Sequence, residues 1–177
     1  MIHVSEPRTD SPQNYGNELQ FLVYKTLNEL HIPYQRVETD EVITMEDCVA
    51  VNEVLNMKMV KTLFLCSRHK QDYYLYITAG KKRFNTKAFS TALGLSRVSF
   101  APEEDMHAIL GTKIGAATVF SALLDSAKDV HIVFDPDVLR EEYYGCSDGT
   151  TTGYMKLRTK DITNRFLPHT GHDYFIV

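Results

Sequence analysis

The sequence predicts an α+β fold: a single domain in which a mixed, mostly antiparallel β-sheet is flanked by helices. Two observations lead to this prediction. Segments with apolar residues at helical spacing are interspersed along the chain with short β-rich runs. Two of those runs, residues 61–66 and 73–79, are joined by a short polar turn, so they form a hairpin that breaks a strict strand–helix–strand alternation.

In the first half of the chain, caps and chain-breaking residues mark where the helices begin and end. Proline cannot continue a helix, and glycine is favoured just past a helix end. The expected elements are a helix from Asn17 to Pro33, a strand at 34–37, a helix capped by Thr44 with its apolar face at 49–55, the hairpin, and a helix from Asn85 to Gly94.

The second half continues the same alternation, with proline at a helix start and glycine at a helix end. The expected elements are a strand at 98–100, a helix from Pro102 to Gly111, a helix at 118–125, a buried strand at 130–134, a helical turn at 135–137, a strand at 150–157, a helix at 160–167 and a strand at 174–177.

A chain of 177 residues with 44% apolar residues is long enough for one domain with a proper core. We expect a flexible tail at 1–13, which is polar and contains Pro7 and Pro12, followed by the folded domain at 14–177. The sequence has no run of 18 apolar residues and no basic and apolar leader at its N-terminus. It therefore predicts a cytoplasmic protein without a membrane span.

Metal and cofactor sites are not expected. The three cysteines are scattered and no CxxC motif occurs, which argues against a disulfide framework and a cysteine-rich zinc site. His169 and His172 are close in sequence but lack the i, i+4 spacing of a helical metal pair. We therefore predict no metal and no cofactor.

The net charge of −4 argues against a broad surface for polyanions. A local contact with a few phosphates remains open, because it needs only a handful of cations. The candidates form one dense group, called here the basic cluster: Lys81, Lys82, Arg83 and Lys87. The alternative is that these residues form a solvated turn and helix start.

Two segments are candidates for a site that binds a negatively charged or ester-bearing ligand. Lys61 begins an apolar strand, where it is either a solvated end residue or a fixed cation that holds a phosphate or carbonyl oxygen. Gly111 and Gly115 bracket a turn before a helix, where free N–H groups could point at a ligand. Alternatively, these glycines only end one helix and relax a loop.

Two further features lie in residues 145–152. Cys146 is expected in a flexible, exposed loop, where it would be a reactive thiol only if a nearby cation lowered its pKa, and no partner histidine is identifiable. Thr150, Thr151 and Thr152 begin a strand, so alternation places Thr150 and Thr152 on one face. The β-propensity of threonine is an equally good explanation for them.

The order of these segments resembles the prolyl-tRNA editing family of the YbaK/ProX type, from about residue 17 to residue 172. The markers are Lys61 at the start of Lys-Thr-Leu-Phe-Leu, a loop at 115–120, Asp125 after the next helix, the strand at 130–135, Thr150 and Thr152, the helix starting Lys160-Asp161-Ile162, and Gly171-His172. The resemblance implies a mixed α+β fold and hydrolysis of the ester that joins a wrong amino acid, such as alanine or cysteine, to proline tRNA.

The resemblance also assigns roles to residues. Lys61 would anchor the terminal adenosine and its ester, and backbone at Gly115 would orient the ester carbonyl, so both are catalytic candidates. A water or a ribose hydroxyl of the substrate would complete the reaction. The residues expected to bind substrate are Thr62, Thr118, Phe120, Gly145, Thr150 and Thr152. The expected partners are the acceptor end of tRNA(Pro), with the basic cluster as a weak contact, and prolyl-tRNA synthetase.

The chain departs from the family pattern at several positions. Gly145-Cys146 stands where the family has a histidine–proline pair, and Val119 stands where its loop has a proline. The family histidine is associated with the amino-acid pocket, so its loss leaves the substrate open. The missing histidine and prolines favour one alternative, a module that binds aminoacyl-tRNA or an amino acid without turnover. A separate alternative is a hydrolase or redox sensor that depends on Cys146.

Overall fold

The computed structural model describes residues 2–42 and 44–177 and confirms the α+β class. Within these residues, the strands form a three-stranded sheet in the order β1-β7-β6 and a five-stranded sheet in the order β4-β2-β3-β5-β8. The strands predicted to form one sheet are therefore divided between two. An isolated parallel bridge between Met59 and Gly145 lies where the two sheets approach each other.

The smaller sheet is antiparallel. Its central strand β7 (Gly153–Arg158) pairs with β1 (Tyr34–Glu38) on one side and with β6 (Tyr143–Ser147) on the other. The sequence predicted a loop around Cys146 and a strand beginning at 150, so β6 is a correction and β7 begins three residues later than predicted. Residues 145–149 have the composition of a turn, and only the pairing with β7 makes residues 145–147 extended.

The larger sheet contains the predicted hairpin of β2 (Val60–Ser67) and β3 (Tyr73–Ala79), whose register places Lys61 opposite Thr78. Strand β4 (Val98–Phe100) pairs antiparallel with the outer edge of β2. On the other side, β5 (His131–Phe134) is parallel to β3, and β8 (Tyr174–Ile176) is parallel to β5. The hairpin and both flanking strands thus confirm the mixed character of the sheet.

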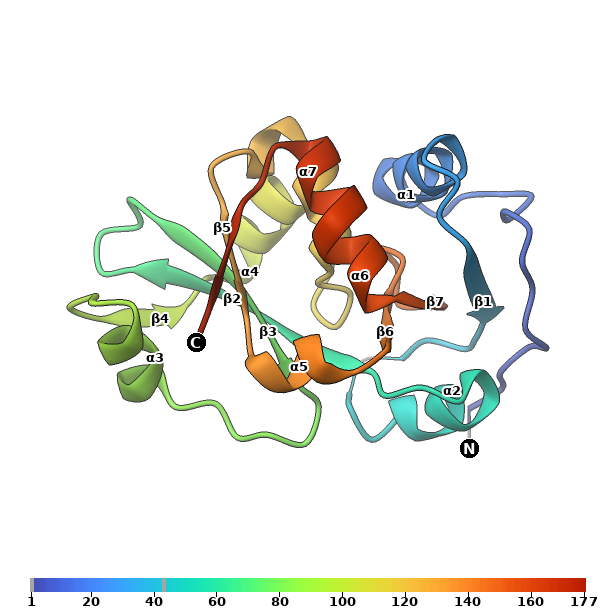
Figure 1. Ribbon diagram of the computed structural model, residues 1–177, viewed down its shortest axis with the longest axis horizontal. Coiled ribbons are helices and arrows are strands. Elements are labelled where there is room, and N and C mark those ends of the chain that lie inside the picture. The colour runs from blue at the N-terminus through green and yellow to red at the C-terminus, as the bar shows by residue number, and fades with distance from the viewer. Residues whose placement is uncertain (1, 43) are drawn as a thin grey trace.

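Helices cover both sheets. The longer ones are α1 (Glu18–Glu29), α2 (Cys48–Leu55) and α3 (Thr86–Ala92), and the shorter ones are α4 (Glu103–Asp105) with the π-helix η1 (Met106–Leu110), the 3-10 helices η2 (Val119–Leu123) and η3 (Asp125–Ala127), α5 (Pro136–Arg140), and α6 (Thr159–Asp161) with the π-helix η4 (Ile162–Phe166) and α7 (Leu167–Thr170). In Figure 1, α1, α2 and the smaller sheet lie on one side and the hairpin with α3 on the other, with α6 and α7 between them.

The predicted caps of α1 and α3 are confirmed. The side chain of Asn17 accepts a hydrogen bond from the Gln20 amide, and that of Asn85 accepts one from the Ala88 amide. Two predictions need correction. Thr44 and Asp47 exchange the expected capping hydrogen bonds, of 3.2 and 3.1 Å, but the regular helix α2 begins only at Cys48. The helix expected at 118–125 is two short 3-10 helices.

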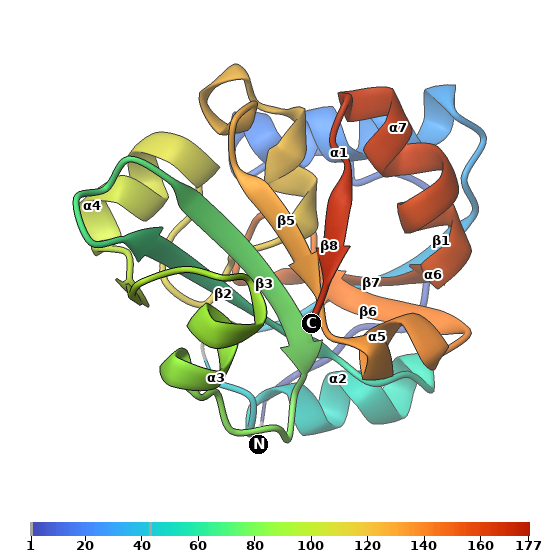
Figure 2. The same cartoon turned by 60° about the vertical axis from the view of Figure 1, so that its left-hand side comes forward.

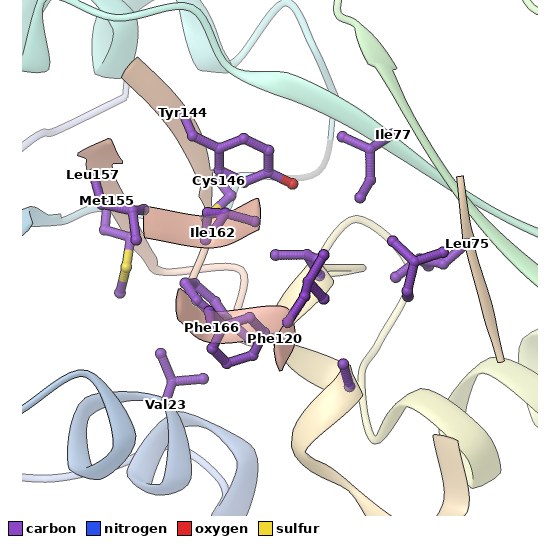
Figure 3. Packing of buried hydrophobic residues seen from close by; sticks show 14 of the residues in the cluster. Val23, Leu75, Ile77, Phe120, Tyr144, Cys146, Met155, Leu157, Ile162 and Phe166 are labelled. Carbon is purple, nitrogen blue, oxygen red and sulfur yellow. The ribbon is translucent and has the colours of Figure 1, made fainter. Parts of the chain in front are cut away.

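The main core lies between the two sheets, with α1 and the α6–η4–α7 segment closing it (Figures 2 and 3). Figure 3 shows Val23 of α1, Ile77 of β3, Tyr144 of β6 and Phe166 of η4 converging on this space. The core thus fixes the two sheets against each other.

The predicted N-terminal tail runs beside β1, where the Arg8 and Arg36 backbones exchange hydrogen bonds of 2.9 and 2.8 Å.

Candidate functional site

A cavity of about 320 Å³, called here the first cavity, is lined by strands of both sheets. One wall is β2 with β4, and the opposite wall combines β6, β7, the segment that leads into α2 and the loop before η2. The described lining residues are Val42, Thr44, Met45, Cys48, Met59, Val60, Lys61, Thr62, Leu63, Phe64, Phe100, Ala101, Met106, Ile114, Gly115, Ala117, Cys146, Ser147 and Tyr154. The cavity brings together three residues predicted for the site: Lys61, Thr62 and Gly115.

Lys61 is half-buried at the start of β2, and its Nζ donates a hydrogen bond to the backbone carbonyl of Lys82. That carbonyl belongs to the turn after β3, which passes close to the cavity wall. A Cβ atom built at Gly80 would lie 2.4 Å from Met45 Cε and 2.9 Å from the Met59 carbonyl oxygen, so only glycine fits there. Because this turn lies close to β2, the Lys82 carbonyl is within hydrogen-bonding distance of Lys61 and orients its ammonium group.

Lys82 itself is held by an acidic pair. Its Nζ lies 2.9 Å from Asp135 Oδ2 and 2.6 Å from Asp137 Oδ2. Asp135 is buried and also accepts hydrogen bonds from Thr78 Oγ1 at 2.7 Å and from the Asp137 amide at 2.9 Å. Burial raises the pKa of Asp135, but the bonds from Thr78, Lys82 and the Asp137 amide outweigh it, so the pKa is lowered. Within the basic cluster, the exposed side chain of Lys82 is thus already paired with two carboxylates of the same chain.

This network predicts acid sensitivity. A carboxyl with a depressed pKa in the folded state stabilises the fold above the pKa of its unfolded form, which is about 3.9, and loses that contribution as the pH falls. We expect the loss of unfolding free energy in Asp135→Asn to be largest near pH 7 and to shrink below about pH 4. Urea unfolding across this pH range measures it, with exposed Asp129→Asn as control. A loss that is independent of pH would contradict the assignment.

The loop at 111–118 forms the opposite rim. Gly115 has a φ of +86°, a left-handed conformation that favours glycine, and it is exposed together with Ile114. The loop is fixed from below because buried Thr118 donates from Oγ1 to the Ser147 carbonyl at 2.8 Å and accepts from the Phe120 amide at 3.3 Å. Thr118 therefore supports the rim and is absent from the cavity lining.

Part of the first cavity's lining is apolar and rich in sulfur: Met45, Cys48, Met59 and Cys146. Burial raises the pKa of Cys48 to about 11, and burial raises the pKa of Cys146 well above its usual value. Both thiols are therefore protonated at neutral pH. The expectation of an exposed, flexible Cys146 was wrong, because the residue lies in β6 and is 2% exposed.

The first cavity offers one fixed cation and no strong base. Among its described lining residues, the only charged side chain is that of Lys61, and histidine, aspartate and glutamate are absent. Such a site can bind a phosphate or polarise a carbonyl at Lys61 while its apolar end accepts a small uncharged group. A nucleophile–base pair cannot be assembled from these residues. Any hydrolysis here depends on positioning and on electrostatic stabilisation.

A second cavity of about 230 Å³ contains the predicted residues Thr150 and Thr152. The structure therefore places both threonines apart from Lys61. The described residues that line the second cavity are Gly16, Asn17, Glu41, Lys113, Ala116, Gly149, Thr150, Thr151 and Thr152.

The loop that carries these threonines is built around Asp148, a buried carboxylate. Its Oδ2 accepts hydrogen bonds of 2.8 Å from both Gln20 Nε2 and the Tyr24 hydroxyl, and its Oδ1 accepts from Thr150 Oγ1 at 2.7 Å and from the Thr150 amide at 3.2 Å. Burial, and then the Asp148 charge, raise the pKa of Tyr24, so its hydroxyl stays protonated and donates. Asp148 thus fastens the loop to α1.

Two further predicted residues lie outside both cavities. Phe120 is fully buried in the core, where its ring makes an edge-on contact with Phe166 at 5.1 Å between centroids (Figure 3). Gly145 is covered by Met57, whose Sδ would lie 2.6 Å from a Cβ atom built there. The whole basic cluster is exposed on the turn after β3 and in α3, and its members other than Lys82 are Lys81, Arg83 and Lys87.

Several residues of the first cavity were not predicted from the sequence. Phe100 and Ile114 line it and are 59% and 52% exposed, while Met45 and Tyr154 line it from other elements. Phe100 sits in a correctly predicted strand, but no local pattern indicates that it lines the same cavity as Lys61. An exposed aromatic or apolar side chain beside a cavity carries no signal of its own in the sequence.

Two properties of the described residues bear on the class of site. They contain no group of three or more histidine, cysteine, aspartate and glutamate residues placed to hold a metal ion. Over the same residues, no helix combines the length and apolarity needed to cross a bilayer.

Comparisons with known proteins agree with this geometry. The family model for the aminoacyl-tRNA editing domain matches residues 39–164. The chain is 29% identical over 140 residues to the prolyl-tRNA editing protein ProX of Acetoanaerobium sticklandii, covering 79% of this chain and 85% of that protein. It is 30% identical over 167 residues to prolyl-tRNA synthetase associated domain-containing protein 1 of Mus musculus, covering 92% and 97%.

The fold is also shared with solved structures. One, described as a "putative trans-editing enzyme for prolyl tRNA synthetase", superposes with a TM-score of 0.65 at 16% identity and covers 92% of this chain and 97% of its own. At that identity the likeness concerns the fold alone. The matched region at 39–164 contains every described lining residue of the first cavity.

Proposed function

Because the chain belongs to the aminoacyl-tRNA editing domain family, we propose that it hydrolyses the ester bond of mischarged tRNA(Pro), such as alanyl- or cysteinyl-tRNA(Pro), acting in trans. The resemblance drawn from the sequence is confirmed at the level of the family. The observation that carries the proposal is that Lys61 and Gly115, 54 positions apart in the chain, line one cavity within the matched region.

In this proposal, the apolar end of the first cavity receives the amino-acid side chain and Lys61 lies beside the ester. A water attacks the carbonyl carbon, the carbon–oxygen bond to the ribose breaks, and the proton from the water passes to the ribose oxygen. The ammonium group of Lys61 stabilises the negative charge that develops on the carbonyl oxygen, and backbone at Gly115 orients the ester. The apolar side chains of Met45 and Met59 in the lining favour a small uncharged side chain.

The tRNA itself would approach over the basic cluster. Gly80 packs against Met45 and Met59 of the cavity wall, so the turn that continues into the basic cluster adjoins the first cavity. Lys82 is paired with Asp135 and Asp137, which leaves the other members for phosphates. Prolyl-tRNA synthetase is the proposed protein partner, since it would produce the mischarged substrate.

The test is hydrolysis of alanyl-, cysteinyl-, seryl- and prolyl-tRNA(Pro) by the purified protein. We expect selective loss of one small mischarged ester, with prolyl-tRNA(Pro) spared, because the apolar end of the cavity favours small side chains. Equal loss of all four would contradict a selective pocket. Binding of charged tRNA without ester loss over hours would favour the alternative, a binding module, for which the lack of a base among the described lining residues is the supporting observation.

A further inference from the structure

The second cavity lies directly beside the first. Three separate segments each place residues one or two positions apart in the walls of both cavities, so the partition between them is only one to two residues thick, and consecutive Cα atoms are ~3.8 Å apart. The three pairs, with the residue of the second cavity given first, are Glu41 and Val42, Lys113 and Ile114, and Gly149 and Ser147.

The second cavity differs from the first in its chemistry. It carries a cation, Lys113, a carboxylate, Glu41, and a row of threonine hydroxyls, whereas the first is mainly apolar. Within the part of the chain that the structure describes, Lys113 is exposed and forms no ion pair, so its ammonium is available. The volume of about 230 Å³ is below the ~300–1,000 Å³ of sites for drug-sized ligands, so it suits a single ring system.

The floor of the second cavity is rigid before any ligand arrives. Asn17 Nδ2 donates to the Gly149 carbonyl at 3.0 Å, and Thr150 is bonded twice to the buried Asp148. Gly149 has a φ of +99°, and a Cβ atom there would lie 3.0 Å from the Leu19 side chain, so glycine is required. A rigid polar floor lowers the cost of ordering the site when a ligand binds.

We propose that the second cavity holds the base of the nucleotide that precedes the terminal adenosine, a cytidine in the C-C-A end of tRNA. This inference rests on the proposed function, in which the aminoacyl-adenosine occupies the first cavity. Lys113, on the rim between the cavities, pairs with the phosphate that links the two nucleosides. Glu41 accepts a hydrogen bond from the cytosine amino group. Uracil presents a carbonyl oxygen at that position, which the carboxylate would repel.

The kinetic test compares alanyl esters of adenosine, cytidylyl-adenosine and uridylyl-adenosine. We expect kcat/KM of the wild type to be about fivefold or more higher for the cytidylyl-adenosine ester than for the other two. Lys113→Ala lowers the ratio between the cytidylyl-adenosine and adenosine esters, and Glu41→Gln lowers the preference for cytidine over uridine. Lys128→Ala, an exposed lysine of neither cavity, is the matched control. Equal rates on all three esters would overturn the proposal.

A binding test separates this inference from the proposed function. If the protein hydrolyses none of the esters, calorimetric titration with cytidylyl-adenosine and with adenosine decides whether the second cavity binds a nucleotide. Tighter binding of the dinucleotide, abolished in Lys113→Ala but kept in Lys128→Ala, supports the second cavity as a nucleotide subsite even without turnover. Equal binding of both probes, or a dinucleotide advantage that Lys113→Ala leaves intact, rejects the subsite.

Discussion

Replacing Lys61 by alanine is expected to reduce kcat/KM for the preferred mischarged tRNA by about 10²–10³-fold, the usual cost of removing one group that stabilises an oxyanion. Lys61 is the only charged side chain among the described lining residues of the first cavity, so none of the others can replace its positive charge. The loss should appear in kcat and not only in KM, because a stabilised transition state is at stake. Single-turnover hydrolysis measures it.

Folding should survive this change. Lys61 is half-buried at a strand end, and its Nζ bonds a carbonyl of the exposed Lys82, so we expect the Tm to move by no more than about 2 °C. Lys58→Ala is the matched control, since Lys58 precedes the same strand and pairs with Glu141 at 2.8 Å outside the cavity. Full deacylase activity of a folded Lys61→Ala protein would exclude Lys61 as substrate anchor.

Among the substitutions proposed for this protein, Asp148→Ala is expected to cause the largest loss of folding stability. The change leaves the buried donors of Gln20, Tyr24 and Thr150 without their acceptor. Each unsatisfied buried donor costs about 1–3 kcal/mol, so we expect a loss of at least about 3 kcal/mol. For a chain of this length, that corresponds to a Tm lowered by about 6–12 °C. Thermal unfolding followed by circular dichroism measures it.

The matched control for this variant is Asp129→Ala, which removes an exposed carboxylate and should change stability by less than about 0.5 kcal/mol. Because Asp148 fastens the floor of the second cavity, the variant should also weaken dinucleotide binding at temperatures where it is still folded. A Tm within about 2 °C of the wild type would show that water replaces the lost acceptor.

Much of the fold follows from patterns that act over a few residues. The apolar periodicity and the Asn17 cap define α1, the Asn85 cap defines α3, and two β-rich runs around a polar turn define the β2–β3 hairpin. In each case the decisive contacts are local, such as a cap that bonds an amide three residues away. The α+β class followed from the order of these elements.

Other elements depend on distant partners. Strand β6 extends through residues 145–147 because they pair with β7 and are buried there, although their composition is typical of a turn. The division of the strands into two sheets depends in the same way on which strands meet across the core. Such pairings bring together residues far apart in the chain, and no local pattern encodes them.

The candidate site divides in the same way. The sequence by itself determined that Lys61 begins an apolar strand and that Gly115 lies in a loop, because charge and backbone freedom are properties of the residues themselves. Only the tertiary structure decided that they share a cavity, that Lys82 is bound by Asp135 and Asp137, and that Thr150 and Thr152 lie in a second cavity. The physical reason is that a cavity and an ion pair are made by packing between distant segments, which periodicity, caps and spacing do not specify.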